Sequence, residues 1–385
     1  MFFHIDKNFN PDFPCHWQLG EFYVSTDPGW SITHRLGVKI LYKGYADSAA
    51  LHTLLEDIIC QPTPKLLGNF CVIAQVDGAL QIQTDRYRSF PIYIGDHVIN
   101  NLVRTDRVAW TDSLITMDRD FDIIEDKSDV IGTFDISEIS LNHALDQVHE
   151  ILTNKTRQFL QHNQLPIKVF LSGGVDTMLV YSYLVAAGAD FELIDYEHLE
   201  HDQFWRSNSH HLIDYWGYQQ THHWRTSCVL ASGAPGDEFM LRSPATANSY
   251  LLYHATSIPK ILNKSDQTYL HRGYFALPKH LELFDQQIRS TGSLQDLHHE
   301  LCNIIVNDWQ HWHLGNTIHW TPLRDLDIFK IIMRLPLEEC VHQIMDSSFS
   351  RILMERNVPG VSKLLSDQKN VGPVFKNISS LFNRF

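Results

Sequence analysis

The chain lacks a long apolar run, paired cysteines and an excess of basic residues, and each absence removes a class of function. No segment approaches the ~20 consecutive apolar residues of a membrane span, so no membrane partner is expected. Residues Met1 to Lys7 lack the basic start and long apolar core of a secretion signal, which predicts a cytoplasmic location. The six cysteines are scattered without a CxxC, so neither a zinc site nor a disulfide framework is indicated.

The balance of charge is acidic. The 385 residues include 31 Lys and Arg against 45 Asp and Glu, a net charge of −14, which disfavours a nucleic-acid partner because that needs a basic surface. Histidine is common, with 23 residues that include the adjacent pairs His210-His211 and His222-His223. No HExxH and no other ligand spacing accompanies them, so solvated or core-edge histidines explain the pairs better than a transition-metal site.

The most informative segment is Ile167–Thr177, which reads Ile-Lys-Val-Phe-Leu-Ser-Gly-Gly-Val-Asp-Thr. A short apolar strand runs into Gly173 and Gly174, which allow a tight turn and close approach to a ligand. The amides of the turn and of the following helix favour an anion, and Ser172 and Thr177 add hydroxyl groups. Asp176 would repel phosphate unless Mg²⁺ bridges the two, so the segment predicts a nucleotide pyrophosphate site. The alternative is an ordinary Gly-Gly turn; a Walker A loop is excluded because no Gly-Lys-Ser/Thr follows.

The pattern of the chain predicts two domains joined by a linker. Residues 1–115 are mostly strands and turns, with a hairpin at Asp77-Gly78 and one helix over 47–60. Residues 116–139 are acidic and aperiodic, which suggests the linker, and Ser140 caps a long amphipathic helix. Strands and helices then alternate, as in a parallel α/β sheet, over 167–171, 178–187, 191–195, 203–217, 219–222 and 226–231. Residues 250–385 are expected to be mostly helical.

A second glycine turn follows the strand that ends at Ala231. It reads Ser232-Gly233-Ala234-Pro235-Gly236-Asp237-Glu238. Ligands of parallel sheets bind beyond the carboxyl ends of the strands, so the two loops are expected at one sheet edge. Asp176 and Asp237 would then share one Mg²⁺-pyrophosphate. Taken alone, this second segment would be no more than a polar turn with solvated carboxylates.

These strings resemble a known family. SGGVDT resembles the Ser-Gly-Gly-x-Asp-Ser/Thr signature of the PP-loop ATP pyrophosphatases, and with SGAPGDE it resembles the synthetase domain of asparagine synthetase and of the β-lactam, carbapenam and lasso-peptide cyclising enzymes. Pro322-Leu323-Arg324-Asp325, followed by Leu335-Pro336, is similar to the family's Pro-Phe-Leu-Asp block. The resemblance implies catalytic roles for Asp176, Asp237 and Lys369, and Mg²⁺ bound by Asp176 and Asp237. The nucleotide-binding residues that it implies are Leu171, Ser172, Gly173, Gly174, Asp176, Thr177, Ser232 and Gly233.

The N-terminal residues extend the resemblance. Leu67-Gly68-Asn69-Phe70 and the block from Asp85 to Tyr93 look like segments of class II glutaminase domains. The fold expected is therefore α/β: an Ntn-hydrolase-like αββα domain over 1–115, a linker over 116–139, and a PP-loop, adenine nucleotide α-hydrolase-like parallel-sheet domain over 140–385 with a helical C-terminal part. Class II glutaminases use an N-terminal cysteine, whereas position 2 is Phe2 and Cys15 is internal. The glutaminase is therefore expected to be inactive.

The function expected from the resemblance is an ATP-dependent, AMP-forming amide ligase that uses ATP and Mg²⁺. Its substrates would be a small-molecule or peptide carboxylate and an amine, and the chain could act as a homodimer. Two departures leave the acceptor open: Ala234 replaces a family glutamate, and only about 60 residues separate Asp176 from Asp237. The alternatives are a PP-loop enzyme that modifies a nucleobase or nucleotide, and a catalytically inactive scaffold.

Overall fold

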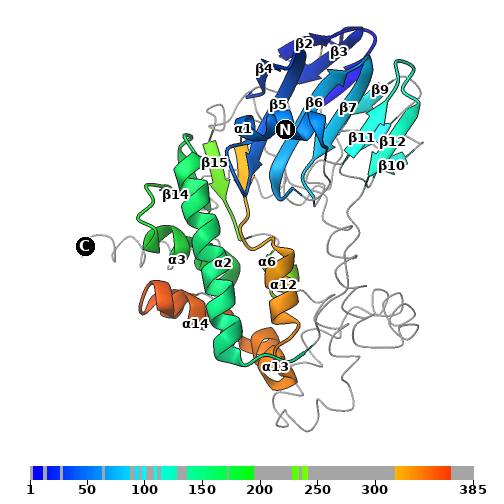
Figure 1. The fold of residues 1–385 in the computed structure, drawn as a ribbon. Helices are drawn as coiled ribbons and strands as arrows, with labels where there is room; N and C mark the ends of the chain where they lie inside the picture. The colour runs from blue at the N-terminus through cyan, green and yellow to red at the C-terminus, as the bar shows by residue number, and fades with distance from the viewer. Residues whose placement is uncertain are drawn as a thin grey trace.

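The protein, seen here as a computed structural model, combines an antiparallel N-terminal part with a parallel C-terminal part (Figure 1). All structural statements below concern the residues that the structure describes, which are 3–11, 15–26, 29–62, 66–86, 92–94, 98–100, 108–110, 114–127, 137–170, 173–194, 228–233, 236–241 and 317–365. The chain is therefore a mixed α/β protein, as the sequence predicts.

Two six-stranded antiparallel sheets form the N-terminal part. The first sheet has the order β10-β8-β9-β1-β3-β2 and contains β1 (Phe3–Asp6), β2 (Cys15–Leu19), β3 (Phe22–Thr26), β8 (Ile92–Ile94), β9 (Val98–Asn100) and β10 (Val108–Trp110). The second has the order β12-β11-β7-β6-β5-β4 and contains β4 (Ser31–Arg35), β5 (Val38–Ala46), β6 (Gly68–Val76), β7 (Ala79–Thr84), β11 (Leu114–Met117) and β12 (Ile123–Lys127).

The sheets stack because side chains alternate along each strand and both faces of the second sheet are apolar. Cys71 and Ile73 of β6 lie in the core between the two sheets. Phe70 and Val72 point the other way, into a second core beneath helix α1 (Leu51–Cys60). The layers described are therefore sheet, sheet and helix. The expected αββα arrangement needs a further helical layer on the first sheet, and the described residues of the N-terminal part contain α1 alone.

The hairpin predicted at Asp77-Gly78 is confirmed. β6 and β7 pair in antiparallel register up to Val76 and Ala79. Asp77 has a φ of 50° and Gly78 a φ of 84°, and positive φ at both central residues is what a two-residue type I′ turn requires. The turn thus sets the register that places alternate β6 side chains in the two cores.

The C-terminal part is built on a four-stranded parallel sheet with the order β14-β13-β15-β16. Its strands are β13 (Ile167–Phe170), β14 (Glu192–Ile194), β15 (Cys228–Ala231) and β16 (Thr317–Trp320). The described helices are α2 (Leu141–His162), α3 (Val175–Ala186), α6 (Gly236–Phe239), α12 (Leu326–Ile332), α13 (Leu337–Asp346) and α14 (Ser348–Asn357), with the 3₁₀ helix η2 (Val361–Leu364). One hydrophobic core joins this sheet to its helices.

Helix α2 has the start that the sequence predicts. Ser140 is its N-cap, and the Ser140 hydroxyl accepts a hydrogen bond from the His143 amide at 3.4 Å. Its apolar stripe buries Leu145, Val148 and Phe159 in the C-terminal core. In Figure 1 the helix runs the length of the C-terminal part and ends near the N-terminal sheets. Near this end, α2 contacts the N-terminal part through Lys155 and Phe159.

Several boundaries differ from the sequence prediction. The expected linker over 116–139 is not a linker throughout, because β11 and β12 pair with each other and extend the second N-terminal sheet. β12 reads Ile-Ile-Glu-Asp-Lys. Three charged residues suit an edge strand, but they also make the segment resemble a polar linker in the sequence. β16 lies within the region expected to be mostly helical. The segments 203–217 and 219–222, predicted as helix and strand, lie outside the described residues. Of the helices described, none is both long and apolar enough to cross a membrane.

Candidate functional site

The first glycine turn joins strand β13 to helix α3. Gly173 has a φ of 76°, a left-handed conformation that favours glycine. Gly174 is the N-cap of α3, so the helix begins at Val175, earlier than the residue 178 that the sequence predicted. Asp176 lies in the first helical turn and Thr177 is buried beside it. The positive end of the α3 dipole therefore meets the end of the loop, as an anion site requires. Leu171 and Ser172 lie outside the described residues.

The second glycine turn follows the neighbouring strand. The Ser232 amide donates to the Trp320 carbonyl at 3.0 Å, which extends the pairing of β15 with β16. The chain then turns at Gly233 and enters the short helix α6 at Gly236. Asp237 belongs to α6 by its backbone, but its side chain lies outside the described part. The structure thus places the backbone of the second loop without placing its carboxylate.

The two loops are in direct contact. A β-carbon on Gly233 would lie 2.3 Å from both the Asp176 carbonyl carbon and the Thr177 nitrogen, and one on Gly236 would lie 2.7 Å from the Asp176 carboxyl carbon. Both distances are below any that real β-carbons show, so only glycine permits this approach. The expectation that the loops meet at one sheet edge is confirmed. The partly buried Asp176 carboxyl group faces the second loop.

The contact between the loops lies where the strand order of the parallel sheet reverses. β13 and β15 are adjacent, but the next strand after β13 is β14 on one side and the next after β15 is β16 on the other. Where connections diverge from neighbouring parallel strands, open α/β sheets bind ligands beyond the carboxyl ends of those strands. The segments SGGVDT and SGAPGDE follow the two strands from which the connections diverge. Strand order therefore marks the same place as the motifs do.

The third sequence block lies at the same edge. Pro322 and Leu323 follow β16, and Leu323 reaches α6, since a β-carbon on Gly236 would come within 2.7 Å of its Cδ1 atom. Asp325 caps helix α12 and accepts from the amides of Asp327 at 2.8 Å and Ile328 at 3.2 Å. The loops that follow β13, β15 and β16 therefore converge, whereas the sequence predicted this only for the first two.

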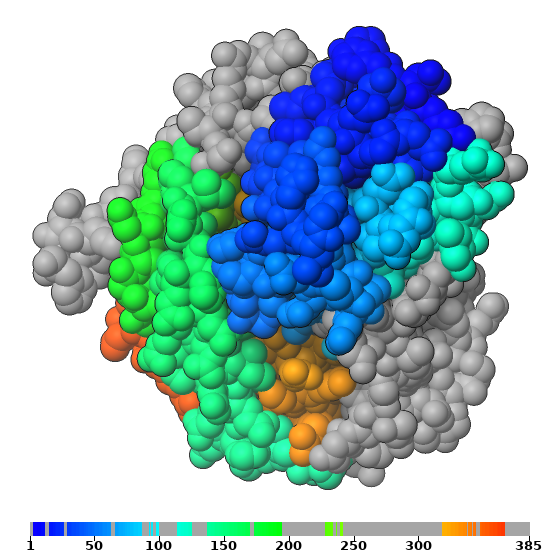
Figure 2. Space-filling view, turned by 45° about the horizontal axis from the view of Figure 1, so that its top comes forward, coloured from blue at the N-terminus to red at the C-terminus, as the bar shows by residue number. Residues whose placement is uncertain are grey.

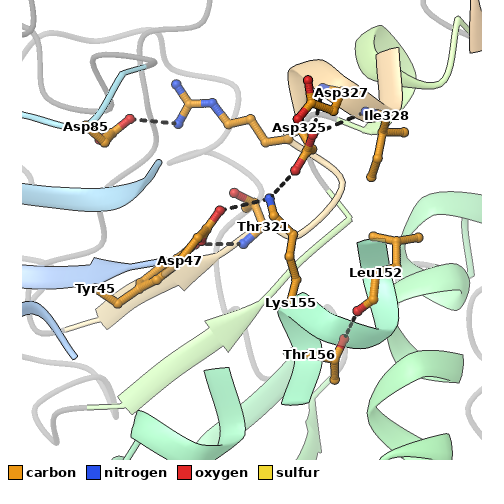
Figure 3. Close-up of polar contacts among 11 residues, drawn as sticks. Tyr45, Asp47, Asp85, Leu152, Lys155, Thr156, Thr321, Asp325, Asp327 and Ile328 are labelled. Atoms are coloured by element: carbon orange, nitrogen blue, oxygen red, sulfur yellow. Dashed lines mark hydrogen bonds and ion pairs between the residues drawn. The ribbon is translucent and has the colours of Figure 1, made fainter. Parts of the chain in front are cut away.

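A charged cluster beside this edge was not foreseen (Figure 3). Lys155 extends from α2 between Asp47 and Asp325, with its Nζ 2.8 Å from Asp47 Oδ2 and 2.7 Å from Asp325 Oδ2. Burial alone would raise the pKa of Asp325, but the charge and hydrogen bond of Lys155 and the two cap amides hold it below its ordinary value. One feature of the sequence could have indicated this cluster. Lys155 lies three residues after Leu152 and four before Phe159, so a charged residue falls within the apolar stripe of the helix.

Several predicted site residues remain untested by the structure. Lys369 and the side chain of Asp237 lie outside the described part, so no Mg²⁺ ligand set can be assembled from it. Among the described residues, no group of three or more His, Cys, Asp or Glu side chains is placed to hold a metal ion. Of the predicted residues, the structure brings together Gly173, Gly174, Asp176, Thr177, Ser232 and Gly233.

In comparisons with known proteins, no protein-family model and no curated protein matches this chain. The family resemblance therefore rests on the motifs and on where the structure puts them.

Proposed function

We propose that the protein is an ATP-dependent, AMP-forming ligase that joins a carboxylate to an amine. The observation that carries the proposal is the contact of Gly233 and Gly236 with Asp176 at the switch point of the parallel sheet. A carboxylate oxygen would attack the α-phosphorus of ATP, and the bond from that phosphorus to the β-phosphate bridging oxygen would break. The amine would then attack the acyl carbon, losing a proton as AMP departs.

The residues present suit such a nucleotide. The glycine turn and the first turn of α3 offer backbone amides to phosphate oxygens. Oxygen ligands are those that Mg²⁺ prefers, so Asp176 and Asp237 would hold the ion, which would neutralise charge on the departing pyrophosphate. Lys369 would add a further positive charge there. The lack of side chains on Gly233 and Gly236 lets the second loop approach the Asp176 carboxyl group, so that one ligand could contact both loops.

We further propose that the N-terminal part hydrolyses no glutamine. Class II glutaminases use a terminal cysteine whose own amine is the base, and Cys15 is an internal residue at the start of edge strand β2. Glutamate release from glutamine should stay at background, with or without a thiol-reactive glutamine analogue. Release above background that the analogue blocks would contradict this proposal.

The ligase proposal is tested by the products of ATP. The protein would be incubated with Mg²⁺ and ATP labelled at the α- or γ-phosphate, together with fractions of a deproteinised cell extract that supply carboxylates and amines. We expect AMP and pyrophosphate from at least one fraction, and far lower turnover with Asp237→Asn at similar ATP affinity. Asp190→Asn, at an exposed position beyond the end of helix α3 that is opposite the first loop, is the matched control and should behave as wild type.

Other products identify the alternatives. ADP and phosphate as the sole products would remove the chain from the adenylating class. Nucleotide binding without cleavage in any fraction would favour an inactive scaffold. A labelled nucleobase or nucleotide among the products would instead favour a nucleobase-modifying enzyme.

A further inference from the structure

The end of β16 and the residue after it are attached to the second N-terminal sheet by two hydrogen bonds between side chains and main-chain groups. Asn69 of β6 donates its side-chain amide to the His319 carbonyl at 3.0 Å. The Thr321 amide donates to the hydroxyl of Tyr45, on β5, at 3.3 Å. Burial raises the pKa of the Tyr45 hydroxyl, so the group stays neutral, and it accepts this bond through a lone pair of its oxygen. Two neighbouring strands of the N-terminal sheet thus hold the end of β16.

Charged pairs fix the same segment three and four residues further on. Arg324 is buried with its Nη1 4.0 Å from Oδ1 of the fully buried Asp85, which follows β7. Lys155 joins Asp47 of the N-terminal part to Asp325, as Figure 3 shows. In Figure 2 the N-terminal residues, in blue, lie directly against α2 in green and against the orange segment that follows β16. The two halves therefore meet through paired charges at this point.

Aromatic packing completes the junction. Phe159 of α2 stacks on Trp320 with ring centroids 4.4 Å apart, and Tyr45 packs edge-on against Phe159 at 5.9 Å. Side chains from β5, α2 and β16 thus form one column across the two halves. Such a column restricts sliding of β16 relative to the N-terminal sheet.

The same segment is part of the candidate site. Leu323 stands between the anchored residues and the loops, because its Cδ1 lies against Gly236, which itself contacts Asp176. The main chain of Trp320 also accepts from Ser232 of the second loop at 3.0 Å. A displacement of 321–325 would consequently move α6 and the surroundings of Asp176. The anchoring contacts and the site share a path of direct contacts.

We infer that Lys155 is a positioning residue: by bridging Asp47 and Asp325 it lets the N-terminal part hold loop 321–325 against the two glycine loops of the site. The inference rests on the proposed function for its nucleotide readout. Replacing a buried ion pair with apolar groups often preserves stability, so a charged arrangement here is better explained by geometry than by stability alone. The N-terminal part thereby acts on the site as a scaffold, without glutaminase chemistry of its own.

The test compares Lys155→Met, which keeps the length of the side chain but removes its charge, with Lys155→Arg, which keeps the charge. Mg²⁺-ATP affinity would be measured by calorimetry well below the melting temperature, and amide hydrogen exchange would be followed in 319–325, in 173–177 and in β7 as a reference. We expect Lys155→Met to weaken binding by about tenfold or more and to speed exchange in 319–325 and 173–177 alone. Lys155→Arg should restore most of the affinity.

The matched control is Arg356→Met, which breaks the exposed Arg356–Asp146 pair of 2.7 Å and should change neither readout. If Lys155→Met does not fold, Asp47→Asn takes its place, because that variant leaves the Lys155–Asp325 pair intact. Its Mg²⁺-ATP affinity and amide exchange then test the inference. Wild-type affinity in the deciding variant, or faster exchange spread evenly over β7 as well, would overturn the inference. If the wild type binds no nucleotide, the proposed function fails, and the exchange pattern alone decides whether Lys155 positions the loop.

Discussion

Replacing Gly233 with alanine should force the two glycine loops apart. The added methyl group would lie 2.3 Å from the Asp176 carbonyl carbon and from the Thr177 nitrogen, whereas ordinary contacts begin at 3.4 Å. Both neighbours are backbone atoms at the start of α3, so no side-chain rotation can make room. The loops must separate by about 1 Å, and overpacking of this kind costs about 1–3 kcal/mol of unfolding free energy.

The same displacement should weaken nucleotide binding. A shift of ~1 Å in a group that positions a substrate can cost on the order of 100-fold in activity, so a clear loss of Mg²⁺-ATP affinity is expected. Denaturant unfolding would give the stability change, and calorimetry the affinity. Gly188→Ala is the control: Gly188 has a φ of 67° but no atom within 4 Å of its added β-carbon. It should lose about 1 kcal/mol from backbone strain and bind nucleotide normally. A Gly233→Ala protein as stable and as tightly binding as wild type would refute the contact between the loops.

Three further predictions concern stability. Burial lowers the pKa of His319 to about 3, so between about 6.5 and that value only the unfolded chain takes up its proton. Unfolding free energy should fall by up to about 1.4 kcal/mol per pH unit as pH drops through this window, and a flatter denaturation profile is expected for His319→Gln. The pKa of Asp325 is low because Lys155 and the cap amides outweigh burial, so its carboxylate contributes stability that is present above about pH 3.9 and is lost as pH falls further. Below that pH, Asp325→Asn should lose less unfolding free energy than wild type. An equal loss in the two proteins would contradict the pairing of Asp325 with Lys155. Ser140→Ala should cost about 0.5–1 kcal/mol in denaturant unfolding, the low end for a cap, because the bond to the His143 amide is 3.4 Å long; no change would show that the cap contributes nothing.

Elements with strong local signals could be predicted from the sequence. Asp77-Gly78 specifies its hairpin because both residues tolerate positive φ. Ser140 marks the start of α2 because its side chain satisfies an amide of the first turn. The meeting of the two glycine loops was predictable because parallel strands present their carboxyl ends at one edge. The nucleotide roles of Asp176, Asp237 and Lys369 stay predictions.

Features that depend on distant partners could not be predicted. β16 has only four residues, Thr-Ile-His-Trp, and a run this short is too weak a signal to be identified as a strand within a region expected to be helical. β12 carries three charged residues in five, so it looks like a linker until β11 pairs with it. Lys155 has meaning only beside Asp47 and Asp325, which are 108 residues before it and 170 after it in the chain. Composition and periodicity hold no information about such contacts.

The measurement that tests the central claim most directly is calorimetric titration of wild type, Asp176→Asn and Asp190→Asn with ATP, with and without Mg²⁺. Asp176→Asn keeps the shape of a side chain packed against Gly233 and Gly236 but removes its charge. We predict Mg²⁺-dependent binding by wild type and by Asp190→Asn, and loss of the Mg²⁺ dependence with at least about tenfold weaker binding in Asp176→Asn. No binding by wild type, or equal Mg²⁺-dependent binding by all three proteins, would contradict a nucleotide site at these loops.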